Sequence, residues 1–147
     1  MEDKKVIWIT GASSGIGRAL AIKFANENWI VAASARRENL LQELKQENEN
    51  IHPFPLDVTN IDQCKNVFKN IVEKFKDIEI SIFGTGIHDP KSEKKFNLDK
   101  IRKIMEVNYF GTMNSINAVY DYYNNKKSGQ ISIISSVAGY RGLPAAG

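Results

Sequence analysis

Short apolar segments alternate with longer amphipathic segments along this 147-residue chain, and this alternation limits the possible fold more than any other feature. The apolar segments are rich in β-branched residues, which predicts buried strands. In the amphipathic segments apolar residues recur at helical spacing, as Ile16, Leu20 and Phe24 do. The predicted strands are 4–10, 29–35, 51–58, 78–86 and 130–135, and the predicted helices are 15–28, 38–50, 61–75 and 97–123.

Strands that alternate with helices require crossover connections and therefore a mostly parallel sheet. Because such crossovers are right-handed, the helices must cover both faces of the sheet. The predicted fold class is therefore a doubly wound α/β structure, formed by residues 1–147 as one domain. Pro53 and Pro55 predict an edge position for the third strand, and Asn28 is expected to end the first helix in a left-handed conformation. Ligands of such sheets bind at the carboxyl ends of the strands.

The first predicted strand ends in the glycine-rich segment TGASSGIG, from Thr10 to Gly17. Glycines between a strand and a helix permit a tight turn and a close approach of the main chain to a phosphate. Free N–H groups at the helix start would hold the diphosphate of a dinucleotide, and two serines add hydroxyl donors. The alternative is a glycine-rich turn that binds nothing. The predicted binding residues are Gly11, Ser13, Ser14, Gly15, Ile16 and Gly17.

The second predicted strand ends in SARRENL, where a dinucleotide-binding sheet meets the adenosine ribose. An acidic residue there would bind the ribose hydroxyls of NAD, but Arg36 and Arg37 follow Ala35 instead. A guanidinium suits a 2′-phosphate, so the sequence favours NADP(H) over NAD(H). The alternative is that both arginines are surface charges at the start of a helix, a position where cations are unfavourable.

The third predicted strand ends in LDVTN, and we include Asp57 and Val58 among the cofactor-binding residues. The carboxylate of Asp57 could accept a hydrogen bond from an adenine amino group. It could equally cap the next helix, unless Thr59 or Asn60 takes that position.

The segments TGASSGIG, ARR, LDV, Val107–Asn108 and ISIISSVAG, in this order, resemble the short-chain dehydrogenase/reductase family. The resemblance implies a Rossmann fold and an NAD(P)(H)-dependent oxidoreductase that interconverts an alcohol and a carbonyl. It further implies that Ser136 hydrogen-bonds the oxygen of a small-molecule substrate and that Asn108 holds a water in a proton relay. Asn108 lies on the apolar stripe of the last predicted helix, so we expect it to face inward, with a structural Asn at a helix bend as the alternative.

Two features depart from the family pattern. The fourth strand of the family usually ends Asn-Asn-Ala-Gly, whereas this chain has Phe83-Gly-Thr-Gly86. Gly84 and Gly86 still allow the main chain to approach a cofactor ribose, but the asparagine side chains are absent. The catalytic tyrosine and lysine of the family would fall just beyond Gly147. We therefore expect an N-terminal part of a longer enzyme, which is not competent for catalysis by itself.

Without the later strands that the family fold implies, the fifth strand would lie at an edge of the sheet. Ile80, Ile82, Ile131 and Ile133 are the candidates for newly exposed surface. An open apolar edge favours association, so we expect a homo-oligomer or a self-associating chain.

Composition restricts the remaining functions. The net charge of +3 is spread along the chain, which predicts neither a nucleic-acid partner nor a membrane surface. A single cysteine, Cys64, and the lack of a signal-peptide pattern predict a cytoplasmic location. His52 and His88 have no partner at ligand spacing, so no metal site is expected. The alternatives to an enzyme are a non-catalytic dinucleotide-binding or regulatory module and a scaffold that has lost its cofactor.

Overall fold

The computed structural model describes residues 4–88 and 96–141. Its centre is a five-stranded parallel sheet with the strand order β3-β2-β1-β4-β5. The predicted doubly wound fold is confirmed, and each predicted strand is present in a shorter form. The strands are β1 (Val6–Thr10), β2 (Ile30–Ser34), β3 (Ile51–Pro53), β4 (Ile80–Phe83) and β5 (Gln130–Ile133).

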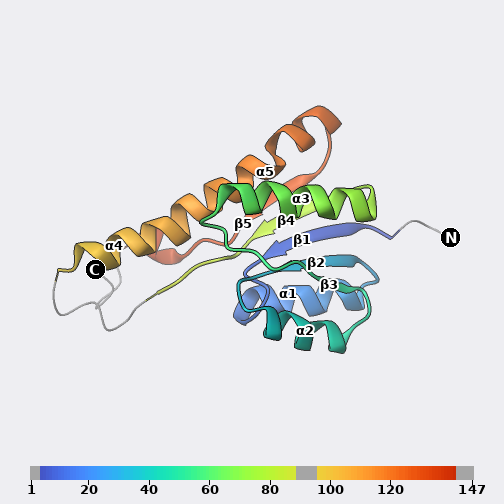
Figure 1. The fold of residues 1–147 in the computed structure, drawn as a ribbon, viewed down its shortest axis with the longest axis horizontal. Coiled ribbons are helices and arrows are strands. Elements are labelled where there is room, and N and C mark those ends of the chain that lie inside the picture. The colour runs from blue at the N-terminus through green and yellow to red at the C-terminus, as the bar shows by residue number, and fades with distance from the viewer. Residues whose placement is uncertain (1–3, 89–95, 142–147) are drawn as a thin grey trace.

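Helices cover both faces of the sheet, as Figure 1 shows. One face is covered by α1 (Gly15–Asn26) and α2 (Glu38–Glu47), and the other by α3 (Ile61–Phe75) and α5 (Gly111–Lys126). This arrangement follows from the right-handed crossovers, because the connections on the two sides of β1 run in opposite directions. The point where the direction reverses lies between β1 and β4.

The residues of β1 alternate between two hydrophobic cores. Val6 and Trp8 pack under α3 and α5, whereas Ile7 and Ile9 pack under α1 and α2. This alternation is the period of a strand that is buried on both faces. The Trp8 indole Nε1 donates a hydrogen bond of 2.9 Å to the Ser34 hydroxyl at the end of β2, and both side chains are fully buried.

Local sequence signals position several of these element ends. Asn28 has a φ of 65°, so the predicted left-handed residue after α1 is confirmed. The Asn60 side chain caps α3 by accepting a hydrogen bond from the main-chain N–H of Gln63. Pro53 lies in β3 at the edge of the sheet, as predicted.

The last predicted helix is interrupted at its centre. It consists of α4 (Leu98–Met105), a π-helical turn at Glu106–Phe110 and α5. Figure 1 shows α4 extending beyond the carboxyl end of the sheet. None of its residues is buried, and Asn108 in the π-helical turn is also exposed. The predicted inward-facing stripe is therefore wrong for this segment of the described chain, because no other described element covers it.

The strand β5 forms the second edge of the sheet. Of the four isoleucines expected to be exposed, only Ile133 is, with 53% of its surface accessible. Ile82 is buried, and Ile80 and Ile131 are partly covered. In the described residues, no helix is long and apolar enough to cross a membrane.

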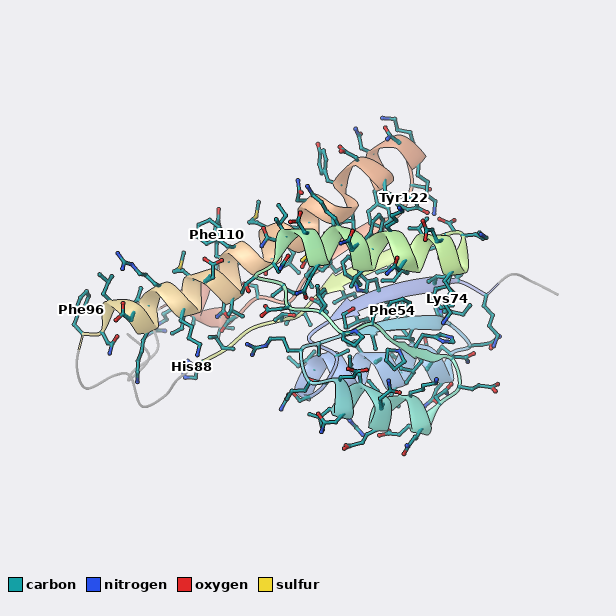
Figure 2. The ribbon with its side chains drawn as sticks, in the orientation of Figure 1. Phe54, Lys74, His88, Phe96, Phe110 and Tyr122 are labelled. Atoms are coloured by element: carbon teal, nitrogen blue, oxygen red, sulfur yellow. The ribbon has the colours of Figure 1, made fainter. Side chains whose placement is uncertain are left out.

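A polar cluster ties α5 to the segment before β4, at the amino end of the sheet. Asp77 Oδ1 accepts hydrogen bonds of 2.5 Å from both the Tyr122 hydroxyl and the Lys126 ammonium. Figure 2 shows Tyr122 near the end of α3. Its ring packs against the Phe68 ring, with a distance of 5.3 Å between the ring centroids. Burial and the hydrogen bond to Asp77 raise the pKa of Tyr122 to about 12. Burial alone would raise the pKa of Asp77, but the hydrogen bonds from Lys126 and Tyr122 outweigh it and hold that pKa below its usual value.

Candidate functional site

A cleft of about 340 Å³ lies at the carboxyl ends of β1, β2 and β4, where the direction of the crossovers reverses. We call it the glycine-turn cleft. This is the position at which doubly wound sheets bind ligands. Except for Gly15, every residue that the sequence predicted to bind the cofactor lines it. The lining includes Gly11, Ser13, Ser14, Ile16, Gly17, Arg36, Arg37, Asp57, Val58, Gly84 and Gly86.

The three glycines of the turn differ in what a side chain at each position would contact. Gly11 has a φ of +74°, and a Cβ there would lie 2.6 Å from the Gly84 carbonyl oxygen. A Cβ on Gly17 would lie 2.3 Å from the Gly11 carbonyl oxygen. Both glycines are therefore required for the packing of the turn itself. Gly15 has a φ of +55°, but a Cβ there would meet no protein atom within 4 Å. The turn thus leaves open space in front of Gly15.

The amino end of α1 faces this space. Its N-cap residue is Ser14, whose side chain makes no capping hydrogen bond, and the first turn carries no acidic residue. The first N–H groups of a helix have no intrahelical partner, and together with the helix dipole they favour an anion. An open helix start beside a glycine turn is the arrangement that binds phosphate groups.

Two arginines place positive charge at the end of β2. The Arg37 guanidinium donates hydrogen bonds through Nη2 to the hydroxyls of Ser13, at 3.0 Å, and of Ser14, at 2.9 Å. This pair of contacts joins the end of β2 to the glycine turn. The Arg36 side chain is exposed and lines the same cleft. The cleft therefore has one arginine held by the serines and a second that faces solvent.

The segment after β3 forms one wall of the cleft. Asp57 Oδ1 accepts hydrogen bonds from the Thr59 main-chain N–H, at 3.0 Å, and from the Thr59 hydroxyl, at 2.8 Å. Because Asn60 caps α3, Asp57 does not act as the cap. Val58 is buried against Gly111, where a Cβ would lie 2.5 Å from Val58 Cγ2.

A second cavity of about 730 Å³ adjoins the first and lies between α5 and β5. We call it the α5–β5 cavity. Asn108 and Ser136, the predicted catalytic residues, both line it. The Asn108 amide hydrogen-bonds the main chain of Ile87 twice, since Oδ1 accepts from its N–H at 2.7 Å and Nδ2 donates to its carbonyl at 2.9 Å. The Ser136 hydroxyl oxygen accepts a hydrogen bond of 3.2 Å from the Ala138 N–H. The two cavities share the segment from Gly84 to Ile87.

Sequence reasoning missed several features of this region. The contacts of Arg37 with the serines join side chains distant in the sequence, and no local pattern signals them. Ser34, Thr85 and Ile134 also line the glycine-turn cleft. The buried Thr10 hydroxyl, beside the altered strand end, has no hydrogen-bond partner within the described part of the chain.

Tyr122 and Lys126 are a tyrosine and a lysine four residues apart, but they lie at the opposite end of the sheet from the cleft. Tyr122 and Lys126 meet at Asp77, before β4 begins, whereas the cleft lies where the strands end. The pKa of Tyr122, about 12, is shifted away from neutrality, and a catalytic base needs the opposite shift. This pair therefore stabilises the fold and does not complete the candidate site.

The fold and the cleft define a doubly wound α/β protein with a glycine-rich turn and an open helix start at its switch point. A sequence profile of the short chain dehydrogenase family matches residues 5–147. The chain therefore belongs to the short chain dehydrogenase family.

Relatives of this chain include a Dictyostelium discoideum "dehydrogenase/reductase SDR family protein 7-like", 36% identical over 92% of this chain and 46% of that protein. A second is the human "dehydrogenase/reductase SDR family member 7", 31% identical over 95% of this chain and 43% of that protein. The Thermotoga maritima "3-oxoacyl-[acyl-carrier-protein] reductase FabG" is 33% identical over 95% of this chain and 58% of that protein. The chain spans about half the length of these curated relatives.

Solved structures show the same fold. "ElxO with NADP bound" superposes with a TM-score of 0.90 at 26% identity, over 97% of this chain and 60% of that one. A short chain dehydrogenase from Bacillus anthracis superposes with a TM-score of 0.83 at 28% identity, over 96% of this chain and 59% of that one. Within residues 4–88 and 96–141, no three His, Cys, Asp or Glu side chains gather as metal ligands.

Proposed function

We propose that this chain is the cofactor-binding part of an NADP(H)-dependent oxidoreductase that interconverts an alcohol and a carbonyl. The observation that carries the proposal is the glycine-turn cleft, in which Gly15 leaves open space in front of an uncapped helix start. A diphosphate would lie against the N–H groups of this turn. The segments at Asp57 and at Gly84–Gly86 would flank the adenosine and the nicotinamide ribose.

The preference for NADP(H) rests on Arg36 and Arg37. Both line the cleft at the end of β2, where an NAD-dependent enzyme would place an acidic residue. The serine contacts hold Arg37 in position, which lowers the entropy lost when it binds a phosphate. The structural neighbour ElxO, which is described with NADP bound, supports a nicotinamide dinucleotide as the ligand.

When bound, the nicotinamide would accept or supply the hydride. The chain's own residues would position the substrate: the Ser136 oxygen accepts from Ala138, which leaves its proton free to be donated to a carbonyl oxygen. Asn108 holds the main chain of Ile87, and so fixes the wall shared by the two cavities. We propose that the acid–base pair comes from a part of the whole protein outside these 147 residues, since Tyr122 and Lys126 lie far from the cleft.

Substitution of Gly15 by Ala tests the cofactor site. A Cβ at this position meets no protein atom and would occupy only the space proposed for the diphosphate. Asn28→Ala is a matched control, because Asn28 has a similar φ of 65° and does not line the cleft. Both variants should change the free energy of unfolding only modestly, by up to about 1–2 kcal/mol. We expect Gly15→Ala to weaken NADPH binding by about tenfold or more and Asn28→Ala to leave it unchanged.

Titration of NADPH fluorescence would measure both affinities. Unchanged NADPH binding by a folded Gly15→Ala variant, or no binding by the parent chain, would overturn the cofactor site. The same titration with NADH tests Arg36: Arg36→Ala should remove a preference for NADPH of about tenfold or more. Equal affinities of the parent chain for the two cofactors would refute the phosphate role.

A further inference from the structure

The segment between β3 and α3, residues 56–60, forms one wall of the glycine-turn cleft and also contacts α5. Leu56, Asp57 and Val58 line the cleft. The Asn114 side chain of α5 donates hydrogen bonds through Nδ2 to the main-chain carbonyls of Val58, at 3.0 Å, and of Thr59, at 3.4 Å. Asn114 itself lines neither of the two cavities. Its amide therefore holds the wall of the cleft without facing the space inside it.

A second contact with α5 holds the side chain of the same wall residue. Val58 is buried, and a Cβ on Gly111 would lie 2.5 Å from Val58 Cγ2. Gly111 has a φ of −62° and a ψ of −37°, an ordinary helical conformation that does not require glycine. Because a glycine inside a helix weakens it, the close approach of Val58 is the structural reason for this residue. Gly111 and Asn114 are three residues apart, so one face of α5 holds both the side chain and the main chain of Val58.

The other hydrogen bonds of this segment define its internal shape and its beginning. The N–H groups of Thr59 and Asn60 donate to the side chain and to the main-chain carbonyl of Asp57, both at 3.0 Å. The Leu56 N–H donates to the Ala35 carbonyl after β2, also at 3.0 Å. None of these bonds reaches α5. The position of the segment relative to α5 therefore depends on Asn114 and on the packing of Val58.

We propose that Asn114 is a positioning residue for the cofactor, because its amide fixes Val58 and Thr59 against α5 and keeps this wall of the cleft in the conformation that receives the adenosine. The proposal rests on the proposed cofactor-binding function. Asn114 acts through residues 56–60 and not on the ligand itself. A wall that is already ordered loses less conformational entropy when a ligand binds, so its fixation raises the affinity.

The variant Asn114→Ala tests the proposal through its affinities for NADP⁺ and for adenosine 2′,5′-bisphosphate, measured by calorimetric titration. The bisphosphate carries the adenosine and the 2′-phosphate of the cofactor but lacks the nicotinamide. Without the two hydrogen bonds, the wall should adopt its binding conformation for only a fraction of the time, and the apparent affinity falls by that fraction. We expect both ligands to bind about tenfold more weakly.

The same helix offers two control positions. Asn117 is an exposed asparagine of α5 that lines neither cavity, so Asn117→Ala should leave both affinities unchanged. Val119 is fully buried in the core under α3 and α5 and also lines neither cavity. Val119→Ala should lower the free energy of unfolding without weakening ligand binding by the folded variant. This second control separates a positioning role from a general loss of stability.

Amide hydrogen exchange, followed by NMR, provides a readout that needs no ligand. The N–H groups of Thr59 and Asn60 bond within the segment, so their exchange reports its local opening. We expect both to exchange about tenfold faster in Asn114→Ala than in the parent, and at the parent rate in Asn117→Ala. Equal rates in the parent and in Asn114→Ala would overturn the proposal.

The ligand measurements distinguish this proposal from the cofactor function on which it rests. If the parent chain binds neither ligand, the cofactor function fails, and the role of Asn114 towards the cofactor fails with it. If the parent binds both ligands and Asn114→Ala binds them equally well, only the positioning role fails. The same holds if Val119→Ala weakens binding as much as Asn114→Ala does. Weaker binding of NADP⁺ alone, with unchanged binding of the bisphosphate, would overturn the assignment of this wall to the adenosine.

Discussion

The buried hydrogen bond between Trp8 and Ser34 connects the core to the functional site, and its removal gives a quantitative test of the structure. Trp8 Nε1 lies 2.9 Å from Ser34 Oγ, and neither residue is accessible to solvent. The main-chain carbonyl of Ser34 also accepts a hydrogen bond of 3.1 Å from Ala12 in the glycine turn. The side-chain bond therefore holds the strand end to which this turn is attached.

The change Ser34→Ala removes the acceptor and leaves the indole N–H unpaired in the core. An unsatisfied buried donor costs about 1–3 kcal/mol, so the free energy of unfolding should fall by that amount. In a Trp8→Phe background the donor is already absent and the buried Ser34 hydroxyl has itself lost its partner, so Ser34→Ala should no longer be destabilising. The difference between the two effects, at least about 1–3 kcal/mol, is the coupling energy of the pair.

Urea denaturation followed by far-ultraviolet circular dichroism measures all four proteins of this cycle. Circular dichroism is used in place of tryptophan fluorescence, because Trp8→Phe removes one of the two tryptophans and would change the fluorescence signal itself. Trp8→Phe itself will be destabilising, since the Trp8 ring packs on Phe68 and Phe83 with centroid distances of 5.8 and 5.6 Å. The cycle cancels that loss. Equal costs of Ser34→Ala in the two backgrounds would refute the hydrogen bond as the cause.

Three further predictions concern other parts of the fold. Thr10→Val should raise the free energy of unfolding by about 1–3 kcal/mol in urea denaturation, because the buried Thr10 hydroxyl has no hydrogen-bond partner in the described chain. A lower free energy of unfolding for this variant would show that the hydroxyl does have a partner. Because the folded-state pKa of Asp77 is lowered, its contribution to stability is present above the ordinary Asp pKa of about 3.9 and is lost as the pH falls through the folded pKa. The stability difference between the parent and Asp77→Asn should therefore shrink below about pH 4, and a constant difference in unfolding measured across this range would contradict it. Sedimentation velocity should show concentration-dependent association of the chain, and Ile133→Lys should weaken it, since Ile133 is exposed on the edge strand β5. A single monomeric species at all concentrations would refute the expected self-association.

Most of the fold could be predicted because its signals are local. The order of strands and helices follows from apolar periodicity, and the limits of α3 match the predicted range. The left-handed Asn28 and the edge position of Pro53 follow from the conformational limits of single residues. The glycine turn is a local feature too, which is why its residues line one cleft together with the residues at the neighbouring strand ends.

The features that sequence reasoning missed depend on tertiary contacts. Asn108 was expected to face inward because it lies on an apolar stripe, but α4 and the π-helical turn extend past the sheet. Its amide instead finds partners in the main chain of Ile87. Likewise, Arg37 was assigned to a phosphate from its position, and its contacts with two serines became visible only in three dimensions.

The pair Tyr122 and Lys126 shows why spacing without topology is insufficient. On a helix, residues four positions apart lie on one face wherever the motif occurs, so the spacing alone does not locate a catalytic site. In a parallel sheet with helical crossovers, each helix begins near the carboxyl ends of the strands and ends near the amino ends. Tyr122 and Lys126 lie in the last turns of α5 and bind Asp77, so they reach only the amino end. A catalytic pair for the glycine-turn cleft must instead lie near the start of a helix that follows a strand, as Ser13, Arg37 and Asn108 lie near the starts of α1, α2 and α5.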